Sequence, residues 1–150
     1  MRSGERERLS REQEGIGIIL ARVFNIEIFN QTISGDATAA PAYYTSDEHA
    51  ALLGSADRLV CQLVLVAQKN QSTIVSIQYQ HNNTMENELW RDASIGAAKS
   101  VTGPANYTDL PAVAWVALNV DVDRGAFGRF KITADKEVAT FRLIVTGYSN

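Results

Sequence analysis

Apolar and polar residues alternate over much of the second half of the chain. A period of two is typical of a β-strand that has a hydrophobic core on one side and solvent on the other. The alternating segments are residues 72–82, 112–123, 128–135 and 139–149. One face of each segment is therefore expected to be buried. The residues expected to share these inner faces are Ala114, Val116, Leu118, Val120 and Val122, then Phe130 and Ile132, then Phe141, Leu143 and Val145.

Two earlier segments predict strands of a different kind. Residues 57–68 (DRLVCQLVLVAQ) are nearly all apolar, which is typical of a strand covered on both faces. Residues 15–34 are rich in Ile, Val and Phe. In this segment the alternation predicts one face with Phe24, Ile26 and Ile28, and an opposite face with Asn25, Glu27 and Phe29.

Residues 46–54 (SDEHAALLG) predict one short helix. Ser46 is a favourable N-cap, because its side chain can accept a hydrogen bond from a free backbone N–H of the first turn. Asp47 and Glu48 suit the positive end of the helix dipole. Gly54 is expected to end the helix.

The order of these elements predicts the fold class. Turn-forming clusters, such as QKNQ, HNNTMEN, SVTGPANYTD and TADKE, separate the strands. About seven or eight strands at this spacing predict an all-β fold, an antiparallel β-sandwich or jelly roll. No alternation of strands with helices supports a parallel sheet. We expect one domain over residues 15–150, preceded by a charged N-terminal arm.

The arm, residues 1–14, contains four Arg and four Glu and very little that is apolar. Such a segment cannot bury a core of its own. Two interpretations stay open: a solvated, frayed terminus, or an arm that becomes ordered against a neighbouring subunit. In the second case the candidate contact residues are Arg6, Arg8, Leu9 and Arg11.

Composition excludes several classes of function. The net charge of −3 and the pI near 5.4 argue against binding of nucleic acid through a strongly basic face. No apolar run is long enough for a membrane span, and the charged N-terminus has no signal-peptide core, so we expect synthesis in a cytoplasm. The single cysteine, Cys61, lies among aliphatic residues and is expected to be a buried, inert thiol.

The sequence offers little for catalysis or metal binding. Asn119, Asp121 and Asp123 stand at every second position before Gly125, as at the start of a calcium loop. The closing Glu of that loop is missing, because Phe130 stands there, so a polar strand face is the favoured interpretation. No catalytic, phosphate-binding or dinucleotide motif occurs. We therefore expect a protein that is not an enzyme and that needs no cofactor or metal.

The two tryptophans are the most informative aromatic residues. An exposed Trp can stack on a sugar, whereas a buried Trp more often packs in a core. Trp90 closes an acidic, Asn-rich turn together with Glu88 and Asp92, and these three residues are the candidate ligand platform. Trp115 lies on the more polar face of its strand, where it could meet a neighbouring subunit. Packing is the favoured interpretation for both.

Residues 57–149 resemble small β-sandwich proteins of tailed bacteriophages. The resemblance rests on the strand TIVSIQYQHN, which leads through an Asn-rich turn to Trp90, and on the closing hairpin GRFKITADKEVATFRLIVTG. This chain departs from the family pattern in the turn, where HNNTMENELW replaces a compact Gly-containing turn. Similar hairpins also occur in discoidin-like and carbohydrate-binding sandwiches.

Within the phage proteins, the size and the missing enzyme motifs resemble capsid decoration (cement) proteins. This resemblance implies a structural virion protein on the capsid surface that binds the major capsid protein, forms a homotrimer, and binds neither nucleic acid nor membrane. The alternative is a β-sandwich module that binds carbohydrate or a host surface, as on a phage tail or an adhesin. In that case Trp90, Glu88 and Asp92 would form the platform.

Overall fold

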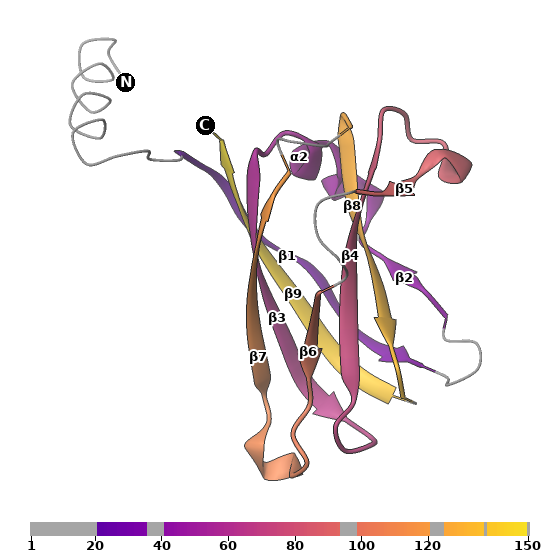
Figure 1. Ribbon diagram of the computed structural model, residues 1–150, viewed down its shortest axis with the longest axis vertical. Helices are drawn as coiled ribbons and strands as arrows, with labels where there is room; N and C mark the ends of the chain where they lie inside the picture. The colour runs from indigo at the N-terminus through magenta and orange to yellow at the C-terminus, as the bar shows by residue number, and fades with distance from the viewer. Residues whose placement is uncertain (1–20, 36–40, 94–98, 121–124, 137, 150) are drawn as a thin grey trace, which may run out of the picture.

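Two antiparallel sheets face each other across one hydrophobic core in the computed structural model, which describes residues 21–35, 41–93, 99–120, 125–136 and 138–149 (Figure 1). The first sheet has the strand order β1-β9-β3-β7; the second has the order β2-β8-β4-β5, and β6 also pairs with β4. This confirms the predicted antiparallel β-sandwich. The strands are β1 (Ala21–Ser34), β2 (Tyr43–Tyr44), β3 (Arg58–Gln68), β4 (Ile74–Asn82), β5 (Arg91–Asp92), β6 (Lys99–Thr102), β7 (Ala112–Asn119), β8 (Phe127–Ala134) and β9 (Val138–Ser149).

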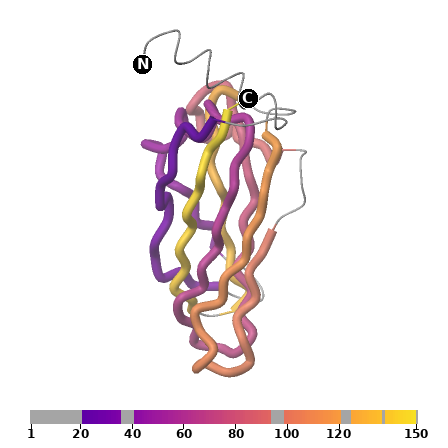
Figure 2. Tube along the Cα trace, turned by 90° about the vertical axis from the view of Figure 1, so that its left-hand side faces the viewer, coloured from indigo at the N-terminus to yellow at the C-terminus, as the bar shows by residue number. Residues whose placement is uncertain are grey.

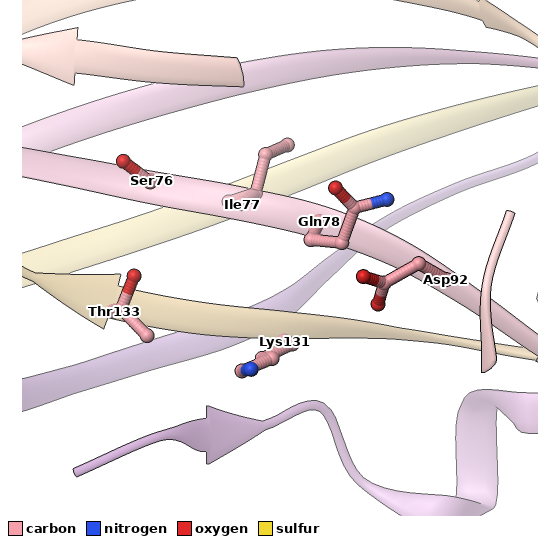
Figure 3. A pocket seen from close by; sticks show the side chains of 6 residues that line it. All are labelled: Ser76, Ile77, Gln78, Asp92, Lys131 and Thr133. Carbon is pink, nitrogen blue, oxygen red and sulfur yellow. The ribbon is translucent and has the colours of Figure 1, made fainter. Parts of the chain in front are cut away.

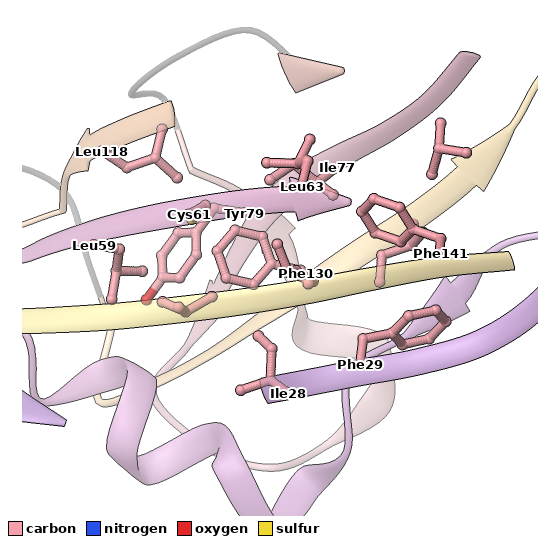
Figure 4. Packing of buried hydrophobic residues seen from close by; sticks show 14 of the residues in the cluster. Ile28, Phe29, Leu59, Cys61, Leu63, Ile77, Tyr79, Leu118, Phe130 and Phe141 are labelled. Carbon is pink, nitrogen blue, oxygen red and sulfur yellow. The ribbon is translucent and has the colours of Figure 1, made fainter. Parts of the chain in front are cut away.

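The core lies between the sheets and is built by the alternation seen in the sequence. The inward residues of β9 and β8 are fully buried, among them Leu143 and Ile132. Phe141 and Phe130, from the same strands, pack in the core shown in Figure 4. The Tyr79 ring of β4 packs edge-on against Phe130, with the ring centroids 5.3 Å apart. The predicted inner faces of β8 and β9 are therefore confirmed. The inner residues of β7 are less enclosed at one end of the strand, since Ala114 and Val116 are only half-buried whereas Leu118 is buried.

Three sequence predictions about the strands need correction. Ile28 and Phe29 are both buried, because a register irregularity between Glu27 and Phe29 interrupts the alternation in β1. β3 is not covered on both faces: Val66, on its outer side, is 40% exposed. Residues 99–102 form β6, where a turn was expected, because they pair with β4.

The predicted helix exists, with one refinement. It begins as a 3₁₀ turn, η1 (Asp47–His49), and continues as α2 (Ala50–Gly54). Ser46 is the N-cap and its Oγ accepts a hydrogen bond from the Glu48 N–H at 3.3 Å, as expected. The helix ends at Gly54, as predicted. The small size of Gly54 is needed because a Cβ would collide with the backbone of Ala126.

Candidate functional site

The outer face of the β1-β9-β3-β7 sheet carries an apolar surface at its β7 edge. Figure 2 looks onto this face, where the four strands run side by side. Cross-strand pairing places Val60 opposite Ala117, Gln62 opposite Trp115, and Val64 opposite Val113. Paired residues of antiparallel strands project to the same side. The surface, called the Trp115 face below, consists of Val60, Gln62, Val64, Val66, Val113, Trp115 and Ala117.

Exposure distinguishes the Trp115 face from an ordinary sheet surface. Trp115 is 67% exposed, Val113 is 47% exposed and Val66 is 40% exposed. Scattered apolar residues on a surface are normal, but a contiguous apolar group centred on a Trp is typical of a binding surface. The packing predicted for Trp115 from the sequence is therefore wrong. The side chain projects from an edge strand away from the core.

The opposite sheet carries a different arrangement, in which one cation lies between two aromatic rings. The guanidinium carbon of Arg129, on β8, lies 4.1 Å from the ring centre of Tyr44 and 4.5 Å from that of Trp90. We call these three residues the Arg129 stack. Partial burial lowers the pKa of Arg129, and the nearby Tyr44 and Asp47 act in the opposite direction. An arginine still keeps its charge at neutral pH, so the stack is cation–π in character.

A hydrogen-bond chain continues from the stack to the rim of a groove. Arg129 Nε donates to Gln80 Oε1 at 2.8 Å, and Gln80 Nε2 donates to Asp92 Oδ1 at 2.9 Å. Gln80 is only 8% exposed, so its amide is held by its neighbours and by these two bonds. The chain fixes which way the Asp92 carboxylate points. One oxygen of Asp92 is used, and the carboxylate as a whole remains exposed.

Beside Asp92 lies a shallow groove of about 230 Å³ (Figure 3). We call it the β4–β8 groove; Ser76, Ile77, Gln78, Asp92, Lys131 and Thr133 line it. Strand register puts Gln78 opposite Lys131 and Ser76 opposite Thr133. The Gln78 amide donates to its neighbour's backbone, Tyr79 O, at 3.0 Å, which leaves its oxygen free to accept. Five of the six lining residues carry a hydrogen-bonding side chain, and the remaining lining is apolar and includes Ile77.

The structure places the residues singled out from the sequence as follows. Trp90 is 5% exposed, in agreement with the packing prediction, so its ring does not form an open stacking platform. Of its two proposed companions, Glu88 lies in the exposed turn η2 (Asn87–Leu89) and Asp92 lines the groove. Trp90 and Asp92 are brought together through Arg129 and Gln80, and Glu88 stays outside this network.

The remaining candidates lie mostly outside the residues that the structure describes. Asn119 is exposed at the end of β7, whereas Asp121 and Asp123 lie outside the described residues, as do Arg6, Arg8, Leu9 and Arg11. Within the described ranges no group of three or more His, Cys, Asp or Glu side chains could hold a metal ion. The same part of the chain has no helix of the length and apolarity that a membrane crossing requires.

The Arg129 stack and the β4–β8 groove were not predicted from the sequence. Tyr44, Gln80, Trp90 and Arg129 come from four separate segments, and only the sheet pairing brings them together. One signal was present: the alternation in β8 already placed Arg129 and Lys131 on the side opposite to Phe130.

Comparisons with known proteins give one structural likeness. No protein-family model matches the chain, and no curated protein matches it. One solved structure is similar, and it is described as a "non-crystalline cellulose specific carbohydrate-binding module: CBM28". The alignment covers 92% of this chain and 84% of the chain in that structure, with 14% sequence identity and a TM-score of 0.43. A likeness at that level carries no argument about function. The antiparallel β-sandwich and the two outer surfaces are what the structure itself establishes.

Proposed function

We propose that this chain is a non-catalytic structural protein that binds a protein shell through the Trp115 face. Within that class we propose a capsid decoration (cement) protein, located on the surface of a tailed-phage virion. The observation that carries the proposal is the 67% exposure of Trp115 among exposed valines.

The energetics of the Trp115 face favour a protein partner. A Trp side chain can bury about 150–250 Å² of surface, and such residues dominate the central, desolvated part of protein interfaces. Val113, two residues before Trp115 on the same strand and 47% exposed, adds aliphatic area beside it. Gln62, directly opposite Trp115, supplies one amide for hydrogen bonding within an otherwise apolar surface. This composition resembles the apolar centre and sparse polar contacts of an interface.

The strand that carries Trp115 adds a second means of attachment. β7 lies at the end of the strand order β1-β9-β3-β7, so within the described residues it pairs in its sheet only with β3. An edge strand presents unpaired backbone N–H and C=O groups, which another chain can use. On a symmetric shell each weak contact is repeated many times, so modest affinity per copy suffices. The partners we propose are the major capsid protein and, in a homotrimer, further copies of this chain.

The test is binding to shells assembled from the major capsid protein of the same genome. The wild-type protein is expected to sediment with the shells and to raise the temperature at which they disassemble. Trp115→Ser is expected to abolish co-sedimentation while the variant stays folded. Met85→Ser is the matched control, because Met85 is 38% exposed but lies in a turn outside the Trp115 face.

Solution mass separates the two proposed partners. Light scattering after size exclusion on the full chain, on a variant lacking residues 1–14 and on Trp115→Ser measures self-association directly. A trimer that Trp115→Ser dissolves would assign the face to other copies of this chain. A genome without a capsid protein, or shells that neither bind the protein nor gain stability from it, would overturn the proposal.

A further inference from the structure

We infer that the β4–β8 groove is a binding site for a sugar, and that it holds one terminal sugar unit of a glycan. This site lies on the outer side of the five-stranded sheet, opposite to the Trp115 face, so it is independent of the proposed shell binding. Both surfaces can be occupied at once.

The chemistry of the lining fits a ligand rich in hydroxyl groups. Asp92 and the free oxygen of Gln78 accept hydrogen bonds, the Lys131 ammonium donates, and the hydroxyls of Ser76 and Thr133 do both. Each sugar hydroxyl can donate one bond and accept others, so it can satisfy either kind of partner. An apolar ligand would bury these groups without hydrogen-bond partners, which disfavours its binding.

The polar groups of the groove have unused capacity. The Lys131 side chain makes no hydrogen bond or ion pair with any residue in the described part of the chain, although the residue is half-buried between β4 and β2. Gln78, Asp92 and Lys131 belong to three different strands, β4, β5 and β8, and all three line the groove (Figure 3). Groups that converge without neutralising one another are available to a ligand.

The site is also pre-organised on the Asp92 side. Tyr44 and Trp90 hold Arg129, Arg129 holds Gln80, and Gln80 holds Asp92, through the ring contacts and hydrogen bonds given above. A carboxylate that is already oriented loses less conformational entropy when a ligand binds. The volume of about 230 Å³ is below the 300–1,000 Å³ typical of drug-sized ligands, which limits the contact to about one sugar ring.

The experiment is a glycan array whose members end in hexoses, N-acetylhexosamines or acidic sugars, probed with the full chain. Each hit is then titrated calorimetrically with the free monosaccharide. We expect binding to at least one class of terminal sugar. Asp92→Asn and Lys131→Gln are each expected to weaken it at least tenfold without lowering the unfolding temperature.

Matched controls remove the same charges elsewhere. Asp109→Asn changes an exposed carboxylate in η3 (Tyr107–Asp109), and Arg58→Gln removes an exposed cation on β3, in the opposite sheet; both are expected to bind like the wild type. No binding to any glycan on the array would overturn the inference, as would binding that the two groove substitutions leave unchanged. Loss of glycan binding in Trp115→Ser alone would assign the sugar to the Trp115 face and overturn the groove assignment.

Discussion

The guanidinium carbon of Arg129 lies 4.5 Å from the ring centre of Trp90. Trp90 is 5% exposed, and the cation that lies on its ring is held in turn by Gln80. Trp115 has no such cover and is 67% exposed. Trp90 therefore contributes to the stability of the fold, and Trp115 is available to bind a partner.

The first prediction separates these two roles by stability. Trp90→Ala is expected to lower the free energy of unfolding by about 3–5 kcal/mol, because a large buried side chain is lost. Trp115→Ser is expected to change it by less than about 0.5 kcal/mol, because the side chain is largely in solvent. Urea denaturation followed by circular dichroism measures both. Equal losses in the two variants would show that Trp115 packs against something in the folded chain.

The second prediction concerns the Arg129 stack. Arg129→Ala removes two cation–π contacts and the hydrogen bond to Gln80, so the free energy of unfolding is expected to fall by about 1–2 kcal/mol. Arg129→Lys keeps the charge but loses the planar donor group, and is expected to fall between Ala and the wild type. The control is Arg22→Ala on the exposed side of β1. Thermal denaturation measures the unfolding temperature of each variant. An unfolding temperature that is lower for Arg129→Lys than for Arg129→Ala would show that the ring contacts do not stabilise the fold.

The third prediction concerns Cys61, which is fully buried on β3. Burial raises the pKa of its thiol to about 12, because the charged thiolate is poorly solvated inside the core. The thiolate is the reactive form, so a thiol reagent at pH 8 is expected to label the folded protein only at the rate of unfolding. Stoichiometric labelling is expected in denaturant. Val113→Cys, at a 47% exposed position, provides the reactive control; rapid labelling of native Cys61 would contradict the burial.

The fourth prediction is a pH dependence at the β1–β9 pair. Arg142 Nε donates to Glu27 Oε1 at 2.6 Å, and this bond lowers the pKa of Glu27 below its usual value of 4.5. A depressed pKa in the folded state gives stability that is present above pH 4.5 and is lost as the pH falls through the folded-state pKa.

The comparison of wild type with Glu27→Gln measures this effect. The wild type is expected to have the higher unfolding temperature at pH 7, and the difference is expected to shrink as the pH approaches 3. Both partners are well exposed, so the difference is small and should decrease in 1 M salt. A difference that is the same at pH 7 and pH 3 would mean that the ion pair does not contribute.

The sequence predicts which residues form the core better than it predicts the arrangement of residues on the surface. Strict alternation identifies Phe130, Phe141 and Leu143 as core, because burial of one strand face requires a period of two. It fails at Phe29, since an irregularity in pairing with β9 cannot be read from β1 alone. The short strands β2 and β5, of two residues each, have no periodic signal and exist only through their partners β8 and β4.

The candidate surfaces depend on pairing even more strongly. The sequence singles out Trp90 and Asp92, but it does not show that Arg129, from a strand nearly forty residues later, lies on the tryptophan. The polar side of β7 suggested a subunit contact for Trp115. Its valine neighbours, however, come from both β3 and β7, and only the register unites them.

The position of β9 has a consequence for synthesis of the protein. β9 is made after all the other described strands, yet it lies in the middle of its sheet, between β1 and β3. Until the ribosome has delivered residues 138–149, β1 and β3 have no partner between them, and the core residues that face Phe141 and Leu143 remain uncovered. A chain grows at about 5–20 residues per second, so this open state lasts for seconds. The first sheet is therefore completed only after residues 138–149 have been made, and until then its uncovered core residues are exposed to aggregation.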